Sequence, residues 1–243
     1  MTFHNRRYAF VSEAENHSLL TAFNTHFQTI TADSPERIRI AQQLRHQVYC
    51  VENPLEPENE EGVERDIFDA HAAHSLLIHR GSDIPVGTVR LILPLGDEAA
   101  TSFPMQTLLD AGTSREFKKI PLHSAAEISR FSISRQSLRL METHDQSQTH
   151  FISNTGPLMR LGLIQALVRM SLQHNITHWC AVMEQSLLRM LAAMGIRFVP
   201  IGPVVEYHGF RQPCFCVLPK MLEDVKCERP AFWSVLTSGG ALA

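Results

Sequence analysis

The sequence predicts a mixed α/β fold, in which helices pack on the faces of one central sheet. The order of its hydrophobic patterns leads to this prediction, because helix-like and strand-like segments alternate along most of the chain. Apolar residues make up 44% of the 243 residues and charged residues 19%, which favours a sizeable core over disorder. This length fits one large domain, or one domain with an added arm.

The first expected unit is an N-terminal arm over residues 1–33. Leu20, Phe23, Phe27 and Ile30 recur at helical spacing and predict a short amphipathic helix, which either packs on the core or covers an apolar channel. The main domain is expected over residues 34–220, and a C-terminal tail over residues 221–243.

The main domain begins with a clear helix start. Asp33-Ser34-Pro35-Glu36 supplies an N-cap, a proline at the first helical position and an acid in the first turn. An apolar stripe then predicts a helix that runs to about Cys50. Residues 53–65 are rich in Pro, Glu and Asn, and predict a mobile acidic loop.

Strand-like segments follow in the middle of the domain. Residues 75–79 and 86–93 predict a hairpin, since residues 80–83 between them are rich in turn formers. A short helix is expected over residues 103–109 and another strand over residues 126–134. Residues 135–155 are polar without a core pattern, so we expect a loop there.

In the last third of the domain, expected helices and strands alternate again. Residues 157–173 are apolar almost all round and predict a buried helix. The other expected elements are a strand over 179–183, a helix over 184–194 and short strands over 198–201, 204–207 and 215–218.

Composition excludes several functional classes. The formal net charge is −3, unlike the basic balance of a nucleic-acid binder. Five cysteines at irregular spacings do not form a disulfide framework, and Arg6, Arg7, Glu13 and Glu15 interrupt any signal-peptide core. Without an apolar run of about 18 residues, no transmembrane helix is expected. We therefore expect a reduced, cytoplasmic protein, and transient membrane contact stays open.

Three acids lie close together after the acidic loop. Glu64, Asp66 and Asp69 fall within six residues, and the spacing of the two aspartates lets a turn set them side by side. Acidic turns are usually solvated, so this segment alone does not establish a site.

Charges inside the expected strands need partners. Arg90 lies in an apolar strand, where an unpaired charge would cost several kcal/mol. Glu127 and Arg130 point to opposite faces of an ideal strand, so either a bulge lies between them or they face different partners. A structural salt-bridge network is one reading of these charges, and a charged cleft is the other.

Four ordered motifs carry a resemblance. They are Arg45-x-x-x-Tyr49, Glu64-x-Asp66-x-Phe68-Asp69, Gly87-Thr88-Val89-Arg90-Leu91 and Glu127-x-Ser129-Arg130-Phe131. Through these motifs the chain resembles acyl-homoserine-lactone synthases, within the GNAT acyltransferase superfamily. The resemblance implies a GNAT-like, mostly antiparallel sheet with helices on both faces. Those synthases carry a tryptophan where this chain has Leu55, and it helps to hold S-adenosylmethionine. Leu55 therefore argues against that substrate.

A second resemblance spans nearly the whole chain. It rests on Val48-Tyr49-Cys50-x-Glu52, His71-x-x-His74, Trp179-x-Ala181-Val182-Met183-Glu184 and a tail motif from Ile201 through Tyr207-His208-Gly209-x-Arg211-x-Pro213-Cys214. Through these segments the chain is similar to acyltransferases associated with PEP-CTERM/exosortase systems, which are related to N-acyl amino acid synthases.

The resemblance implies an N-acyltransferase that carries a fatty acyl group from a thioester to an amine. Glu127 is then the base that accepts the amine proton. Asp66 and Asp69 hold the positively charged acceptor, and Arg90 and Arg130 keep these acids ionised. Backbone N–H groups near residues 131–133 polarise the carbonyl. The expected substrate-binding residues are Arg45, Tyr49, Glu64, Phe68, Ser129, Phe131 and Ile133.

The donor is an acyl carrier protein or acyl-CoA, and no tightly bound cofactor is expected. The Gly-rich turn that holds a pyrophosphate is reduced to Gly156 before Pro157, which favours the carrier protein. Its acidic surface would suit Arg135, Arg139 and Arg160, unless these are unrelated surface residues. Apolar residues of 157–170 are expected to line the acyl pocket.

Other functions remain as alternatives. They are an autoinducer synthase that uses S-adenosylmethionine and a non-catalytic protein that binds acyl groups or a carrier. The charged set argues against the non-catalytic protein. A metal site at Cys214, Cys216 and His208 is not expected, because no second Cys/His pair has zinc spacing. Cys50 as an acyl-accepting nucleophile is a weaker alternative to a packed role.

Overall fold

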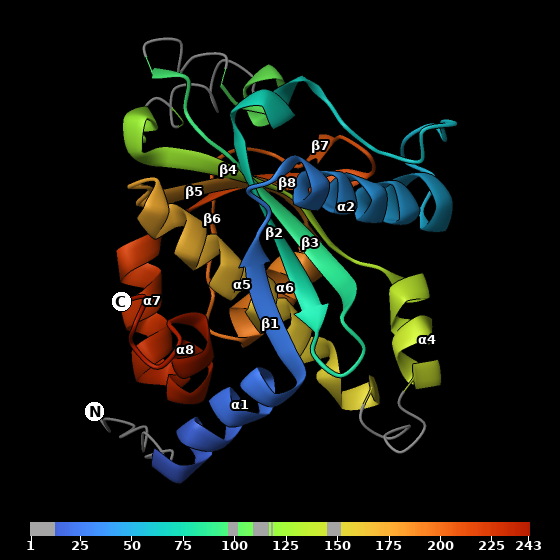
Figure 1. Ribbon diagram of the computed structural model, residues 1–243. Coiled ribbons are helices and arrows are strands. Elements are labelled where there is room, and N and C mark those ends of the chain that lie inside the picture. Colours follow the sequence, from blue (N-terminus) through green and yellow to red (C-terminus); the bar gives the residue numbers. More distant parts are fainter. Residues whose placement is uncertain (1–12, 97–101, 109–116, 118, 145–151) are drawn as a thin grey trace, which may run out of the picture.

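A single open sheet organises the molecule. The computed structural model describes residues 13–96, 102–108, 117, 119–144 and 152–243. The strands are β1 (Phe27–Thr31), β2 (Ala72–His79), β3 (Ile84–Ile92), β4 (Ala125–Ile133), β5 (His178–Glu184), β6 (Val199–Pro200), β7 (Val205–Glu206) and β8 (Phe210–Val217). Their order is β1-β2-β3-β4-β5-β8-β6, with β7 paired to β8 (Figure 1). Only the β4–β5 pair is parallel among these described strands.

The helices connect and flank these strands. They are α1 (Glu13–His26), α2 (Pro35–His46), α4 (Arg135–His144), α5 (Ile152–Gln173), α6 (Gln185–Ala193), α7 (Leu218–Glu228) and α8 (Pro230–Leu236). The expected N-cap holds, since the Ser34 side chain accepts a hydrogen bond from the Arg37 N–H. Beyond α2 the chain continues as a π-helix over Gln47–Glu52.

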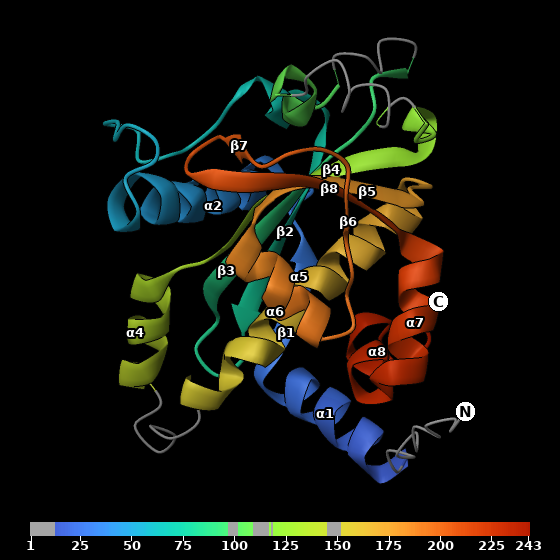
Figure 2. The same cartoon turned by 180° about the vertical axis from the view of Figure 1, so that it is seen from behind.

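Helices cover both faces of the sheet, as β2 shows. Successive side chains of a strand point to opposite faces. Leu77 belongs to the main core, which α5 fills from one side, whereas Leu76 and Ile78 pack with Ala41 of α2. Figure 2 shows α5, α7 and α8 away from α2 across the sheet. This confirms the predicted fold class, a GNAT-like mixed sheet with helices on both faces.

The first and last segments of the described chain contribute to the same core. Phe23 and Phe27 are buried in it, and so are Val225 and Val235. Helix α1 packs against α8. Segments on either side of the predicted boundaries at residues 33 and 220 therefore share one hydrophobic core.

Three expectations about secondary structure were wrong. Phe27 and Ile30 do not continue the N-terminal helix, because it ends at His26 and both residues pair with β2. Residues 135–144 form helix α4 rather than a loop, and α5 begins at Ile152 rather than at residue 157. The residues between these two helices lie outside the described part. The tail contains two helices, α7 and α8, that no pattern predicted.

The other elements match the prediction with bounds that differ by up to five residues, as where β8 begins at Phe210 rather than at residue 215. The short helix expected over residues 103–109 is a 3-10 turn over Pro104–Leu108. Residues 53–65 form the expected irregular segment. Among the described helices, none is both long and apolar enough to cross a bilayer.

Candidate active site

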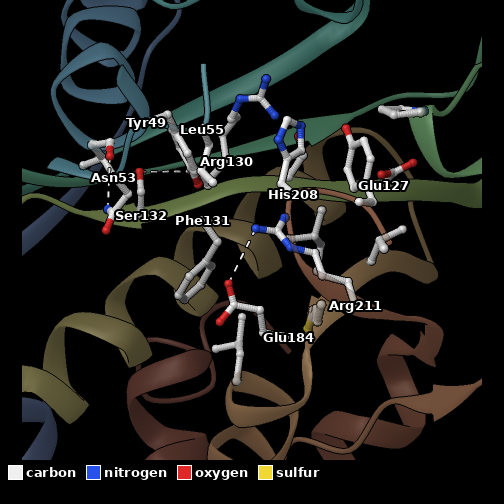
Figure 3. A pocket seen from close by; sticks show the side chains of 18 of the residues that line it. Tyr49, Asn53, Leu55, Glu127, Arg130, Phe131, Ser132, Glu184, His208 and Arg211 are labelled. Atoms are coloured by element: carbon white, nitrogen blue, oxygen red, sulfur yellow. Dashed lines mark hydrogen bonds and ion pairs between the residues drawn. The ribbon is translucent and has the colours of Figure 1, made fainter. Parts of the chain in front are cut away.

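A cavity of about 580 Å³ lies where β4 and β5 separate. The two strands pair over Ala125–Glu127 and His178–Cys180. Farther along, residues 128–133 of β4 and residues 182–184 of β5 line the cavity together. Figure 3 shows side chains entering it from several elements. A parting of two parallel strands thus creates a hollow in the middle of the sheet.

A β-bulge brings Glu127 and Arg130 to this one cavity. In the β3–β4 ladder, Arg90 pairs with Ser129 and Thr88 pairs with Ser132, so β4 has one extra residue. Arg130 takes a left-handed conformation with a φ of 52°. The bulge resets the alternation of side chains, and both Glu127 and Arg130 line the cavity. Of the two explanations that the sequence left open, the bulge is confirmed.

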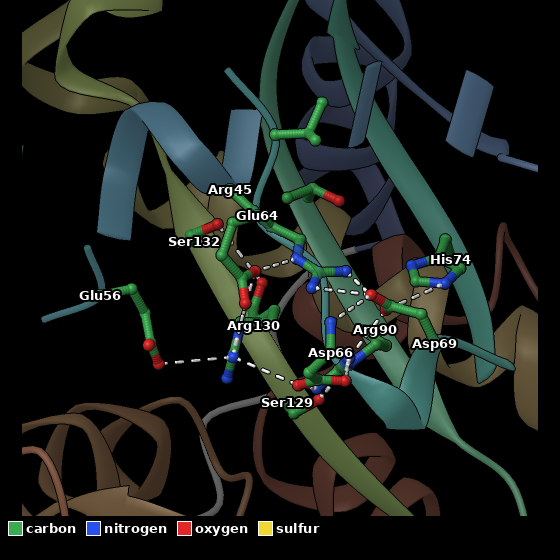
Figure 4. Close-up of polar contacts among 12 residues, drawn as sticks. Arg45, Glu56, Glu64, Asp66, Asp69, His74, Arg90, Ser129, Arg130 and Ser132 are labelled. Carbon is green, nitrogen blue, oxygen red and sulfur yellow. Dashed lines mark hydrogen bonds and ion pairs between the residues drawn. The ribbon is translucent and has the colours of Figure 1, made fainter. Parts of the chain in front are cut away.

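Three arginines and three acids form a buried ion-pair network beside the cavity (Figure 4). Arg45 donates to Glu64 and, at 2.7 Å, to Asp69. The other distances are 2.6 Å for Arg90 Nη1–Asp66 Oδ1, 2.7 Å for Arg90 Nη1–Asp69 Oδ1 and 2.7 Å for Arg130 Nη2–Glu64 Oε1. The formal charges of these six side chains cancel, which is what buried ions require.

Local structure pre-arranges the acids of the network. Asp66 caps the 3-10 turn Ile67–His71, with its side chain accepting from the Phe68 N–H and the Asp69 side chain accepting from the Asp66 N–H. This capping box fixes the two aspartates beside each other, as the sequence spacing predicted.

Ionisation of the acids follows from their partners. Burial raises the pKa of Glu64, but hydrogen bonds from Arg130 and Arg45 more than offset it and lower the pKa to about 2. Burial likewise opposes the ionisation of Asp69, and Arg45 and Arg90 hold its pKa well below the ordinary value. Both acids are therefore carboxylates at neutral pH.

The predicted site residues divide into two groups. One group lines the cavity: Tyr49, Asp66, Phe68, Glu127, Ser129, Arg130, Phe131 and Ile133. The other group lies behind it in the network and is not part of its lining: Arg45, Glu64, Asp69 and Arg90. Asp66 and Arg130 belong to both the network and the lining, so they connect the buried ions to the space where a ligand would bind.

Glu127 stands apart from the network. Its side chain is 4% exposed and accepts a hydrogen bond of 2.9 Å from the Met105 N–H. Burial raises the pKa of Glu127 to about 8, although the Met105 N–H and the charges of Arg90 and Arg130 lower it. The structure therefore places one acid with an elevated pKa in the cavity wall, beside an already neutralised set of ions.

Activity that needs an ionised Glu127 should rise with pH. With a pKa of about 8, about one tenth of the free enzyme carries the carboxylate at pH 7. We expect kcat/KM to increase about tenfold per pH unit below this pKa and to level off above it. Initial rates between about pH 6 and pH 9 test this, and a flat profile would contradict the role of Glu127 as a base.

Several cavity residues escaped the sequence-based site. Glu56, Glu184, Tyr207, His208 and Arg211 all line it. Three of them, Tyr207, His208 and Arg211, lie in the motif at residues 201–214. That motif contributed to the second resemblance, but its residues had no assigned role. The tail motif was therefore visible in the sequence, but its place at the cavity follows only from the pairing of β8 with β5.

The cysteines lie elsewhere. Cys50 is buried, and desolvation raises the pKa of its thiol. Neither Cys50 nor Cys214 is part of the cavity lining. In the described part of the chain, no cluster of three or more His, Cys, Asp or Glu residues has metal-binding geometry.

A segment that forms much of this site matches a known family model. Residues 44–154 match the acetyltransferase (GNAT) domain model. The match covers slightly less than half of the chain. The matched segment holds the capping turn, the bulged strand and all six ions of the network, and the enzymatic class is that of an acyltransferase. No curated protein matches the chain by sequence.

Solved structures share the GNAT-like fold beyond the matched segment. The N-acyl amino acid synthase FeeM from uncultured soil microbes has a TM-score of 0.54 at 13% identity, covering 82% of this chain and 94% of that chain. TofI, in a ternary complex with an inhibitor and MTA, has a TM-score of 0.58 at 18% identity over 84% and 99%. The CoA-dependent acyl-homoserine lactone synthase BjaI, with SAM and isopentyl-CoA, has a TM-score of 0.55 at 16% identity over 88% of each chain.

Proposed function

We propose that this GNAT enzyme transfers a long fatty acyl group from a thioester to the amino group of an amino acid or a similar amine. One observation carries the proposal: Glu127, an acid with an elevated pKa, faces the cavity without an arginine partner at hydrogen-bond distance among the described residues. A group of this kind suits proton transfer better than structural pairing.

The reaction proceeds by direct aminolysis. The acceptor arrives as an ammonium ion and gives a proton to the Glu127 carboxylate, and its nitrogen attacks the thioester carbonyl. The C–S bond then breaks as the C–N bond is completed, and the departing thiolate takes the proton from Glu127. The regenerated Glu127 carboxylate accepts the second proton of the nitrogen and releases it to solvent, which leaves a neutral amide and a thiol. Backbone N–H groups at the bulge near residues 131–133 polarise the carbonyl oxygen. Asp66 attracts the ammonium ion, and the bound positive charge favours the ionised form of Glu127.

The apolar side of the cavity suits the acyl chain. Its lining includes Ile128, Phe131, Ile133, Ile164, Val182, Met183, Leu187 and Leu191. The sequence placed the acyl pocket along residues 157–170, but of that helix Arg160 and Ile164 line the cavity, whereas Leu161, Leu163 and Leu167 are buried in the core. Helix α6 supplies the additional apolar wall.

Substitutions in this wall should change the preferred chain length. Leu187→Trp fills part of the cavity, so we expect the acyl chain that gives the highest kcat/KM to become shorter by several carbons. Leu172→Trp is the matched control, because Leu172 is an exposed residue outside the cavity lining. Competition between acyl donors of different length measures the preference, and the same optimum in both variants would contradict the placement of the acyl chain.

An acyl carrier protein is our preferred donor. Arg160 lies at the cavity and Arg139 is exposed, so both are available to an acidic partner. Arg135 is less available than expected, since its guanidinium donates to the Glu52 carbonyl and to Asn53. BjaI is a CoA-dependent synthase, and for this reason acyl-CoA remains the alternative donor to test.

S-adenosylmethionine is not our preferred acceptor. Leu55 lines the cavity at the position where the resembling synthases carry tryptophan, and its side chain is 39% exposed. A small aliphatic side chain offers a sulfonium ion no aromatic face. The tail motif at residues 201–214 supports placing the chain with the exosortase-associated acyltransferases. Five free cysteines suit a cytoplasmic setting.

Product formation tests the proposal. The purified protein is supplied with a dodecanoyl carrier protein or dodecanoyl-CoA and a mixture of the twenty standard L-amino acids. We expect new N-acyl amino acids in the mass spectrum, with the carrier-protein donor giving the higher rate. No amide with either donor would overturn the proposed function.

A further inference from the structure

Arg211 enters the cavity from the strand opposite Glu184. In the β5–β8 ladder Glu184 pairs with Arg211, and on the other side of β8 Val205 of β7 pairs with the same arginine. Arg211 lines the same cavity as Glu127. Figure 3 shows its guanidinium inside the cavity, with Glu184 as its marked ion-pair partner. A charge on a central strand is thus directed at the ligand space.

This guanidinium is poorly satisfied by the protein. Its Nε is buried and has no hydrogen-bond partner among the described residues. The approach to Glu184 is 3.5 Å from Nη2 to Oε1, and the Glu184 side chain is 58% exposed. A long ion pair to an exposed acid is weak, while a buried donor without an acceptor is unfavourable.

The three arginines of the buried network differ from Arg211 in this respect. Arg45, Arg90 and Arg130 each donate to carboxylates at hydrogen-bond distance. Their charges are already balanced by Glu64, Asp66 and Asp69. Arg211 therefore supplies the cavity with a positive charge that the network does not neutralise.

Arg211 and Glu127 can act on one small ligand. Glu127, Tyr207 and Arg211 all line the same cavity, so a ligand bound there can meet both charged side chains. An α-amino acid carries its ammonium and its carboxylate on the same carbon atom. With the amine beside Glu127, the carboxylate can pair with Arg211, which lines the same cavity.

We infer that Arg211 binds the carboxylate of the acceptor, so that the enzyme acylates free amino acids in preference to amines that lack a carboxylate. The inference rests on the proposed function and names its substrate class. The bond is a charge-assisted pair, to which an arginine can donate two parallel hydrogen bonds. Sites built to pair with one charged group reject analogues that leave that site unpaired.

Matched acceptors test the inference. The twenty L-amino acids and the twenty corresponding amino acid carboxamides are each supplied with a dodecanoyl carrier protein and with dodecanoyl-CoA. We compare the wild-type protein with Arg211→Met, Arg211→Lys and Arg197→Met, the last being a control at an exposed arginine paired with Glu228. KM and kcat are measured for the best free acid and for its carboxamide, together with the KM of the donor.

We expect wild-type kcat/KM to be at least tenfold higher for the acid than for its carboxamide. Arg211→Met should raise the KM of the acid at least tenfold more than that of the carboxamide, with a smaller change in kcat. Arg211→Lys should recover part of the difference, and Arg197→Met should match wild type. An unchanged ratio of acid to carboxamide in Arg211→Met, or a rise confined to the KM of the donor, would overturn the inference.

The proposed function can fail separately. If carboxamides are acylated and free acids are not, acyl transfer stands and the role of Arg211 is wrong. If neither set is acylated, the proposed function fails, and thermal unfolding with the same acids and carboxamides decides the inference. Stabilisation by acids that is lost in Arg211→Met supports it, and equal stabilisation by acids and carboxamides contradicts it.

Discussion

Replacing Glu127 by glutamine should reduce kcat/KM by about 10²- to 10⁴-fold, the range that a positioned proton acceptor contributes. The amide cannot accept the ammonium proton, but its oxygen can still accept the hydrogen bond from the Met105 N–H. We therefore expect the KM of the acyl donor to change little. Initial rates near pH 8 with a saturating donor measure the effect.

Stability separates this chemical role from a structural one. Burial raises the folded-state pKa of Glu127 to about 8, so the free energy of unfolding falls as the pH rises from the ordinary pKa of a glutamate to about 8. Glutamine removes that penalty. The free energy of unfolding of Glu127→Gln at this pH should equal or exceed that of wild type.

Glu223→Gln is the matched control for this substitution. Glu223 is an exposed residue on α7 outside the cavity lining. We expect it to retain wild-type rates and stability. A Glu127→Gln enzyme with wild-type kcat/KM, or one whose loss of rate follows only from unfolding, would contradict the assignment of Glu127.

The second large effect concerns Arg45, at the back of the ion-pair network. Arg45→Met leaves Glu64 and Asp69 without one of their two arginine partners in a buried setting. Removing one member of a buried pair costs about 3–5 kcal/mol, because the remaining charge stays desolvated. We expect a loss of this size in the free energy of unfolding, measured by urea denaturation near neutral pH.

An exposed ion pair provides the comparison for Arg45. Arg197→Met breaks a contact of 2.6 Å with Glu228, where both side chains are about half exposed. Surface pairs contribute about 0–1 kcal/mol, so this variant should be nearly as stable as wild type. Equal losses in the two variants would mean that the network does not stabilise the fold.

The sequence predicted β2 to β5 and most of the long helix, because each is a mainly apolar run between polar segments. It missed α4 because most residues of this segment are polar, although Leu138 and Met141 lie three residues apart and both pack in the main core. It also extended the first helix through Phe27 and Ile30. Spacing alone cannot distinguish these residues from a strand, and pairing with β2 decides the outcome.

The charged residues of the site were predictable as a set. Which of them line the cavity and which lie behind it was not predictable. Asp69 and Arg90 look equivalent to Asp66 and Arg130 in the sequence, yet the first pair lies behind the cavity and the second pair lines it. The bulge decides this for Arg130, and bulges leave a weak sequence signal. Arg211 comes from β8, far along the chain, and only the pairing of β8 with β5 places it at the cavity. Local sequence patterns do not reveal that pairing.

The central claim is that this cavity passes an acyl group from a thioester to an amine. The most direct measurement is the ratio of amide formed to thiol released when the purified enzyme, a dodecanoyl thioester and an amino acid mixture react near pH 8. We expect one amide for each thiol, with thiol release that depends on the amino acids and is lost in Glu127→Gln. Thiol release at the same rate without amino acids, or without amide, would contradict the account.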